Sequence, residues 1–161
     1  IDSKSVAIGY IYGSAKRYAL SYNGSDGQVF RATTEYETEY KEESDKTQAT
    51  TKLAIDWRYF LSLSNQQVLA SRLVIASSNN SQAYSLGGND SSAKFIGDEP
   101  IFGRTSYPLR GYKNTGYASN VFIGSLEWRI PINRPERGLW QLPIASMQNS
   151  YNLFVDVGSL S

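Results

Sequence analysis

The chain contains no cysteine and no histidine among its 161 residues. It therefore has no thiol nucleophile, none of the usual zinc ligands and no imidazole for acid–base catalysis. No serine–base pair and no pair of carboxylates stands out, so we expect no catalytic residue, no metal site and no cofactor. The lack of cysteine does not fix the compartment, because disulfide-free proteins occur in the periplasm, the outer membrane and the cytosol.

The sequence also lacks a strong charge imbalance and a long apolar run. It has 16 basic and 15 acidic residues, a net charge of +1, which gives no electrostatic basis for binding nucleic acid. No apolar run approaches the roughly 18 residues that a membrane-spanning helix needs. Strands that cross a membrane are not excluded, because they show only a weak alternation of polar and apolar residues.

Aromatic residues are abundant, whereas helix-forming runs of Leu, Ala, Glu and Lys are scarce. The chain contains 12 Tyr, 6 Phe and 3 Trp, but only one Met. Together with many Thr, Val and Ile residues, this composition favours strands and predicts an all-β protein. At this length we expect one domain that covers residues 1–161.

A two-residue period is clearest between Phe30 and Tyr40. Apolar, aromatic or Thr residues occupy the even positions, and Arg31, a threonine and three glutamates occupy the odd ones. A strand over 28–42 would be about 50 Å long at ~3.3 Å per residue, and the short turns elsewhere predict antiparallel, up-and-down neighbours. The same pattern predicts seven strands in total, over residues 4–13, 17–23, 28–42, 47–64, 67–77, 124–132 and 153–159.

The longest segment without a strand pattern covers about residues 79–120 and is rich in Ser, Asn, Gly and Asp. Compact soluble domains rarely carry so long a loop unless it has a function. Arg110 lies in this loop among Gly and Pro residues, which is a poor position for a core residue. Glu127 and Asp156 each lie on a strand whose opposite face is apolar, and carboxylates from two strands would fix such an arginine to the sheet.

Two environments are compatible with these strands. In a soluble β-sandwich the tyrosine-rich faces pack together and the glutamate-rich faces meet water. In a transmembrane barrel the tyrosine-rich faces meet lipid and the charged faces line a wet lumen. The strand lengths, the mixture of charge signs on the polar faces and the aromatic residues near strand ends favour the barrel. The predicted membrane girdle consists of Tyr36, Tyr40, Trp57, Tyr59 and Trp128.

Seven strands are too few to close a transmembrane barrel, since about eight is the smallest number. An open edge facing lipid is excluded, because its backbone groups would have no hydrogen-bond partners. If the strands cross a membrane, the chain is therefore one part of a larger barrel.

Three motifs in order resemble the BamA-type outer-membrane β-barrel superfamily, also called the bacterial surface antigen family. They are Leu109-Arg-Gly-Tyr112 in the long loop, Ser125-Leu-Glu-Trp-Arg-Ile-Pro131, and Phe154-Val-Asp-Val-Gly158. Each motif alone is weak, and the order and spacing of all three make the resemblance more specific. The similarity covers the chain from about residue 17 onward and is strongest over 102–158.

The resemblance implies an antiparallel, up-and-down transmembrane barrel of sixteen strands, of which this chain supplies about seven. It implies a loop latch in which Arg110 contacts Glu127 and Asp156, Gly111 permits a tight backbone reversal, and Tyr112 stacks or bonds nearby. The last three barrel strands and any periplasmic transport-associated domain are expected to lie outside this sequence.

The resemblance also implies a location in the bacterial outer membrane and a role in the assembly or secretion of other proteins. The partners it implies are membrane lipid, the remainder of the barrel, unfolded outer-membrane or secreted client proteins, and accessory lipoproteins. Two alternatives stay open: a soluble β-sandwich binding domain, and a barrel that only anchors another fused domain. Glu35, Glu37 and Glu39 are interpreted as a wet strand surface rather than a cation site.

Overall fold

The computed structural model describes residues 2–16, 25–41, 46–63, 67–87, 102–113, 116–131 and 150–161. Within these ranges the protein is all-β, as its composition predicts. They contain no helix that is long and apolar enough to cross a membrane. The strand predicted over 17–23 lies outside the described residues.

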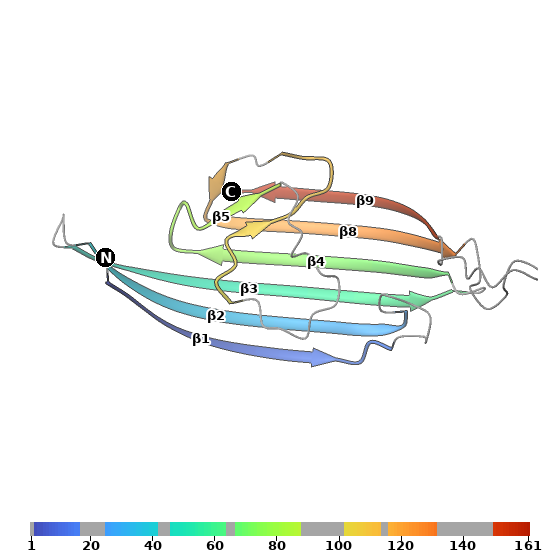
Figure 1. Cartoon of the computed structure of the whole chain (residues 1–161), viewed down its shortest axis with the longest axis horizontal. Coiled ribbons are helices and arrows are strands. Elements are labelled where there is room, and N and C mark those ends of the chain that lie inside the picture. The colour runs from blue at the N-terminus through green and yellow to red at the C-terminus, as the bar shows by residue number, and fades with distance from the viewer. Residues whose placement is uncertain are drawn as a thin grey trace, which may run out of the picture.

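Six long strands form one antiparallel sheet in the order β1-β2-β3-β4-β8-β9. Each of them therefore pairs with the long strand that precedes or follows it in the chain. Figure 1 shows them side by side, and β1 and β9 form the two edges. This confirms the up-and-down order and the long strands, of which β3 is the longest with 17 residues. The six are β1 (Asp2–Gly13), β2 (Gly27–Lys41), β3 (Lys46–Ser62), β4 (Val68–Ser78), β8 (Asn120–Pro131) and β9 (Ser150–Leu160).

The segment 79–120 is not a plain loop, and this corrects the prediction. It contains β5 (Tyr84–Leu86), β6 (Ser106–Tyr107) and β7 (Tyr117–Ala118), which form a small sheet in the order β6-β5-β7. Strands of two or three residues are too short to show a period in the sequence, so alternation could not reveal them. This small sheet lies over one face of the large sheet, where β5 contacts β8 and β9 (Figure 1).

The face of the large sheet that carries β5, β6 and β7 is called the inner face, and the opposite one the outer face. On β1 the outer-face residues are Val6, Ile8, Tyr10 and Tyr12, which are all uncharged. The outer-face residues of the other five long strands are also apolar or uncharged. Most of the large apolar residues on the outer face are exposed, including Ile8 at 70% and Val155 at 65%.

The inner face combines a small apolar core with buried charge. The core lies between the two sheets and joins Tyr84, Leu86, Tyr107 and Leu109 of the covering layer to Ala54, Val74, Ala76, Val121 and Ile123 of the large sheet. Charged residues are buried on the same face: Arg31, Asp56, Arg58, Arg72 and Glu127. The polar face of the strands is thus the covered one, and the aromatic face is the open one.

Candidate functional site

Arg110 contacts both carboxylates that the sequence analysis selected for it. Its Nε and Nη2 atoms donate to the two carboxylate oxygens of Asp156 at 2.6 and 2.8 Å, and its Nη1 atom donates to Glu127 Oε2 at 2.9 Å. This is a bidentate pair with a third charge-assisted bond, the strongest kind of contact that a guanidinium makes with carboxylates. The arrangement holds the loop against β8 and β9.

Strand register explains why the two acids converge. Ser125 lies opposite Asp156 and Glu127 lies opposite Phe154, so the two carboxylates are diagonal neighbours on the inner face. The loop turns directly after the arginine, because Gly111 has a φ of 84° and the Tyr112 N–H donates to the Leu109 carbonyl at 3.2 Å. A left-handed φ of this kind favours glycine, as the sequence analysis expected of Gly111.

Two further side chains complete the group of residues that we call the latch cluster: Arg110, Glu127, Asp156, Phe154 and Arg129. The Arg110 guanidinium carbon lies 3.8 Å from the centre of the Phe154 ring, within the range of a cation–π contact. Arg129 Nε donates to Glu127 Oε1 at 2.8 Å, so Glu127 accepts from two arginines. Phe154 belongs to a motif seen in the sequence, but its contact with Arg110 depends on the register and was not predicted.

The side chains of the latch cluster differ in their exposure to solvent. The side chain of Arg110 is 35% exposed, whereas those of Glu127 and Asp156 are buried. The hydrogen bonds to Asp156 raise the pKa of Arg110, and partial burial opposes the shift. Because its donors and acceptors bond each other, the cluster is suited to holding the loop in place.

Tyr112 lies apart from the latch cluster. Its side chain is 61% exposed, and within the described part of the chain it makes neither a hydrogen bond nor a ring stack. It instead lines an open cavity of about 460 Å³ beside the edge strand β9, together with Leu86, Leu109, Asp156 and Gly158.

The five residues predicted as a membrane girdle all lie on the outer face. The side chains of Tyr36, Tyr40, Trp57, Tyr59 and Trp128 are between 39% and 51% exposed. Tyr36 lies opposite Thr51 and Tyr40 opposite Thr47, toward one end of the sheet. Trp57, Tyr59 and Trp128 gather toward the other end, because Trp57 lies opposite Leu73 and Trp128 opposite Leu69. Their role at a membrane surface stays a prediction.

A second group of charges, which we call the Asp56 cluster, was not selected from the sequence. Asp56 accepts from Arg58 at 3.1 and 2.8 Å and from Arg72 at 3.2 and 2.9 Å. All three side chains are buried. The alternation placed Asp56, Arg58 and Arg72 on the polar face, but only the register of β3 against β4 shows that they meet.

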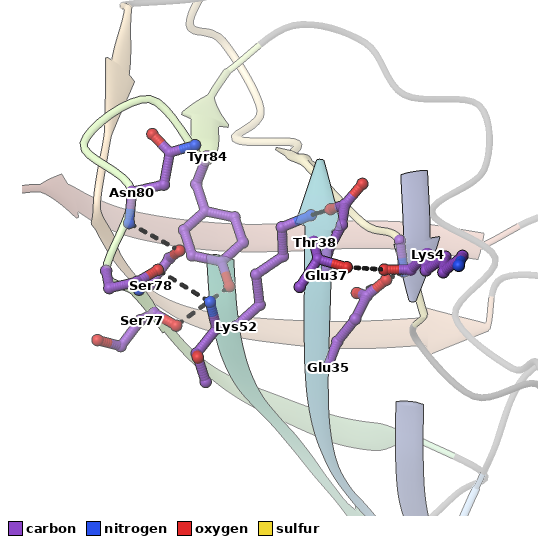
Figure 2. A network of polar contacts seen from close by, with 12 residues as sticks. Lys4, Glu35, Glu37, Thr38, Lys52, Ser77, Ser78, Asn80 and Tyr84 are labelled. Atoms are coloured by element: carbon purple, nitrogen blue, oxygen red, sulfur yellow. Dashed lines mark hydrogen bonds and ion pairs between the residues drawn. The ribbon is translucent and has the colours of Figure 1, made fainter. Parts of the chain in front are cut away.

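The glutamates of β2 differ from their interpretation as a wet surface, because two of them are half-buried and bonded. Lys52 donates to Glu37 at 3.0 Å (Figure 2), and the Gly103 N–H of the covering loop donates to Glu35 at 3.1 Å. Figure 2 also shows the Tyr84 hydroxyl, which donates to the Ser77 carbonyl at 3.2 Å. Burial, with a contribution from the charge of Glu35, raises the pKa of Tyr84 to about 12.

Among the described residues no group of three or more acidic side chains is arranged to hold a metal ion. Comparisons of the chain with models of protein families, with curated proteins and with solved structures found no match.

Proposed function

We propose that this chain is part of an outer-membrane β-barrel of the BamA type. In this proposal the six-stranded sheet is a sector of the barrel wall, its outer face meets lipid, and the inner face lines the lumen. Further strands beyond β1 and β9 close the barrel, sixteen in all, because an open edge in lipid would leave backbone groups without partners.

The observation that carries the proposal is the contrast between the two faces. A soluble sheet turns its apolar face to a core, and each Å² left in water forgoes about 25 cal/mol of stabilisation. Here the chain covers its own charged face with the loop layer, and the apolar face stays exposed over all six strands. A large exposed apolar surface marks an interface with protein or membrane. Lipid is the partner that also explains the lack of charge on the outer face between Val6 and Tyr12 of β1 and on the other five strands.

The positions of the aromatic residues support the same environment. Tyr36 and Trp57 are separated along the sheet by about six residues, or ~20 Å at 3.3 Å per residue. Tyr40 and Tyr59 are about twelve residues apart, or ~40 Å. These two separations bracket the apolar band of about 25 Å that a transmembrane barrel presents between its aromatic girdles. Trp57 and Trp128 each donate their indole N–H to a glutamine, Gln28 and Gln67, as interfacial tryptophans need a polar partner.

Within this barrel the loop fixed by Arg110 lies in the lumen and sets the shape of the space that a client polypeptide meets. The support for a role in assembly or secretion is the resemblance carried by the three motifs, in which the arginine and two acids have matching positions. The close contacts among Arg110, Glu127 and Asp156 agree with that correspondence. A barrel that serves only as an anchor would need the same latch for its stability alone.

Adjacent residues of β1 provide the test of environment, because Ala7 and Ile8 point to opposite faces and both are exposed. The chain has no cysteine, so Ala7→Cys and Ile8→Cys each create one labelling site for a fluorophore. In membranes that contain the protein, we expect nitroxide-labelled lipid to quench the label at 8 and aqueous iodide to quench the label at 7.

Equal quenching of both labels by iodide, in a protein that stays monodisperse without detergent, would instead support the soluble β-sandwich. A functional assay tests the alternative that the barrel only anchors another fused domain. If that alternative holds, an Arg110 variant that still folds leaves client secretion and insertion at the wild-type rate.

A further inference from the structure

The loop segment from Phe102 to Arg110 reaches both edge strands of the large sheet, and we call it the brace segment. At one end Phe102 lies against Gly9 of β1. At the other end Leu109 lies against Gly158 of β9, and Arg110 bonds Asp156 of the same strand. A single stretch of chain therefore crosses the inner face from β1 to β9.

A glycine forms the seat at each end. A Cβ atom added at Gly9 would lie 2.9 Å from Phe102 Cζ, and one added at Gly158 would lie 3.0 Å from a methyl carbon of Leu109. Both distances are shorter than ordinary van der Waals contact, so the absence of a side chain lets the brace segment approach the sheet. Gly13 lies on the same strand and face as Gly9, and a Cβ atom there would meet nothing within 4 Å.

The Phe102 end has a second contact, with β2. The Gly103 N–H donates to Glu35 Oε2 at 3.1 Å, and Glu35 lies opposite Ala7 in the β1–β2 register. Glu35 is thus the acceptor that positions this end of the brace segment, as Asp156 and Glu127 are the acceptors at the other end.

The two ends differ in strength. The Arg110 end has three bonds between charged groups, at 2.6 to 2.9 Å. The Phe102 end has one bond from a neutral amide to a carboxylate, and Phe102 remains 42% exposed. Three bonds between ionised partners, two of them a bidentate pair, hold a loop more firmly than one bond in which only the acceptor is ionised. Segments with few buried contacts open at the lowest free energy.

We propose that Gly9, Phe102 and Glu35 form a second anchor of the in-folded loop, and that this anchor opens first. Its opening uncovers the inner face of β1 and β2 while Arg110 keeps the other end on β8 and β9. The inference rests on the in-folded loop of the proposed function and on the Arg110 contacts that hold its other end, but it does not depend on lipid around the sheet.

Trypsin cleavage reports the two ends separately, because Arg104 lies next to the Phe102 end and Arg110 lies in the latch cluster. Gly9→Ala is the test variant and Gly13→Ala its matched control. The new methyl group meets the far end of the Phe102 ring, so the ring shifts and the strand keeps its place. We expect cleavage after Arg104 to accelerate roughly fivefold in Gly9→Ala, as for the loss of about 1 kcal/mol. Cleavage after Arg110 stays at the wild-type rate, and Gly13→Ala behaves as wild type at both sites.

Two more variants guard against a failure of Gly9→Ala to fold. Phe102→Ala and Glu35→Ala remove the other two members of the anchor, and each is expected to raise cleavage after Arg104 as well; Glu39→Ala is the control for the acid on the same strand. Equal rates in Gly9→Ala and Gly13→Ala overturn the anchor. A joint rise after Arg104 and Arg110 overturns the separate opening, since the loop then leaves as one unit. Both results are independent of the quenching test of lipid contact, so failure of the anchor and failure of the barrel proposal are distinguishable.

Discussion

Two arginine–carboxylate clusters described above lie on the inner face and use the same chemistry in different ways. In the Asp56 cluster one carboxylate lies between two guanidiniums, Arg58 and Arg72, all on β3 and β4. In the latch cluster two carboxylates of β8 and β9 bind the guanidinium of Arg110, which arrives on a loop. The side chain of Asp56 is fully buried, whereas Arg110 is 35% exposed.

The strand register and the sequence separation of the bonded residues indicate which parts of the structure each cluster holds together. Arg58 and Arg72 lie directly opposite each other on β3 and β4, a pairing of like charges that destabilises a sheet unless an acid lies between them. Asp56 supplies that acid, so its cluster belongs to the pairing of two neighbouring strands. Arg110 joins residues 17 and 46 positions away, so the latch cluster fixes the position of a loop on a sheet that pairs without it.

The comparison predicts the largest effect for Asp56→Asn. The substitution leaves two buried guanidiniums facing each other without their shared acid, and breaking a buried charge pair in this way costs about 3–5 kcal/mol. We expect the free energy of unfolding, measured by denaturant titration, to fall by this amount and the β3–β4 pairing to lose its hydrogen-exchange protection.

Glu39→Gln is the control for this prediction, because Glu39 is an inner-face acid outside both clusters. A loss of stability in Asp56→Asn that is no larger than in this control would mean that the two arginines do not need the carboxylate.

A smaller effect, confined to the loop, is expected for Arg110→Glu. It repels Glu127 and Asp156, but solvent screens a partly exposed group, so the expected loss is roughly 1–3 kcal/mol. The Tyr112 amide, which donates to Leu109 beside Arg110, is expected to exchange its hydrogen faster, while hydrogen exchange in β8 and β9 stays slow. Adding Glu127→Arg creates a new pair of opposite charges and is expected to restore part of the loop protection.

If Arg110→Glu unfolds the sheet as thoroughly as Asp56→Asn, the distinction between a cluster for the sheet and a cluster for the loop is wrong. If Glu127→Arg restores nothing, direct pairing between positions 110 and 127 is not what holds the loop.

The sequence analysis selected the three residues that meet at Arg110 but not those of the Asp56 cluster. Two signals selected the first group: the resemblance carried by the three motifs, and the local pattern around each residue. Arg110 stands in a segment without a strand period, where an arginine beside glycines is conspicuous, and the acids lie in recognisable strands. Asp56 and Arg58 stand in a regular alternation, and their meeting with Arg72 depends on a register that period-two patterns leave open.

The same limit applies to the covering layer. Alternation gave the long strands and the orientation of their faces, which the structure confirms for β2, β3 and β4. It gave no sign of β5, β6 and β7, because the pairing of such short strands comes from their packing on the inner face. The contact of Gly103 with Glu35 was equally hidden, since it joins residues 68 positions apart.

The smallest expected effect separates ring stacking from charge pairing inside the latch cluster. Phe154→Leu keeps an apolar side chain on β9 but removes the aromatic face that lies 3.8 Å from the Arg110 guanidinium. A cation–π contact at a partly exposed site contributes about 0.5–1 kcal/mol, so loop protection should fall by this amount. Phe122→Leu is the matched control, because Phe122 is 45% exposed and Phe154 50%, and Phe122 lies on the outer face of β8. A double-mutant cycle that combines Phe154→Leu with Arg110→Ala identifies the cause. The effect of Phe154→Leu should vanish once the guanidinium is gone. An effect that persists would show that the ring acts by packing alone.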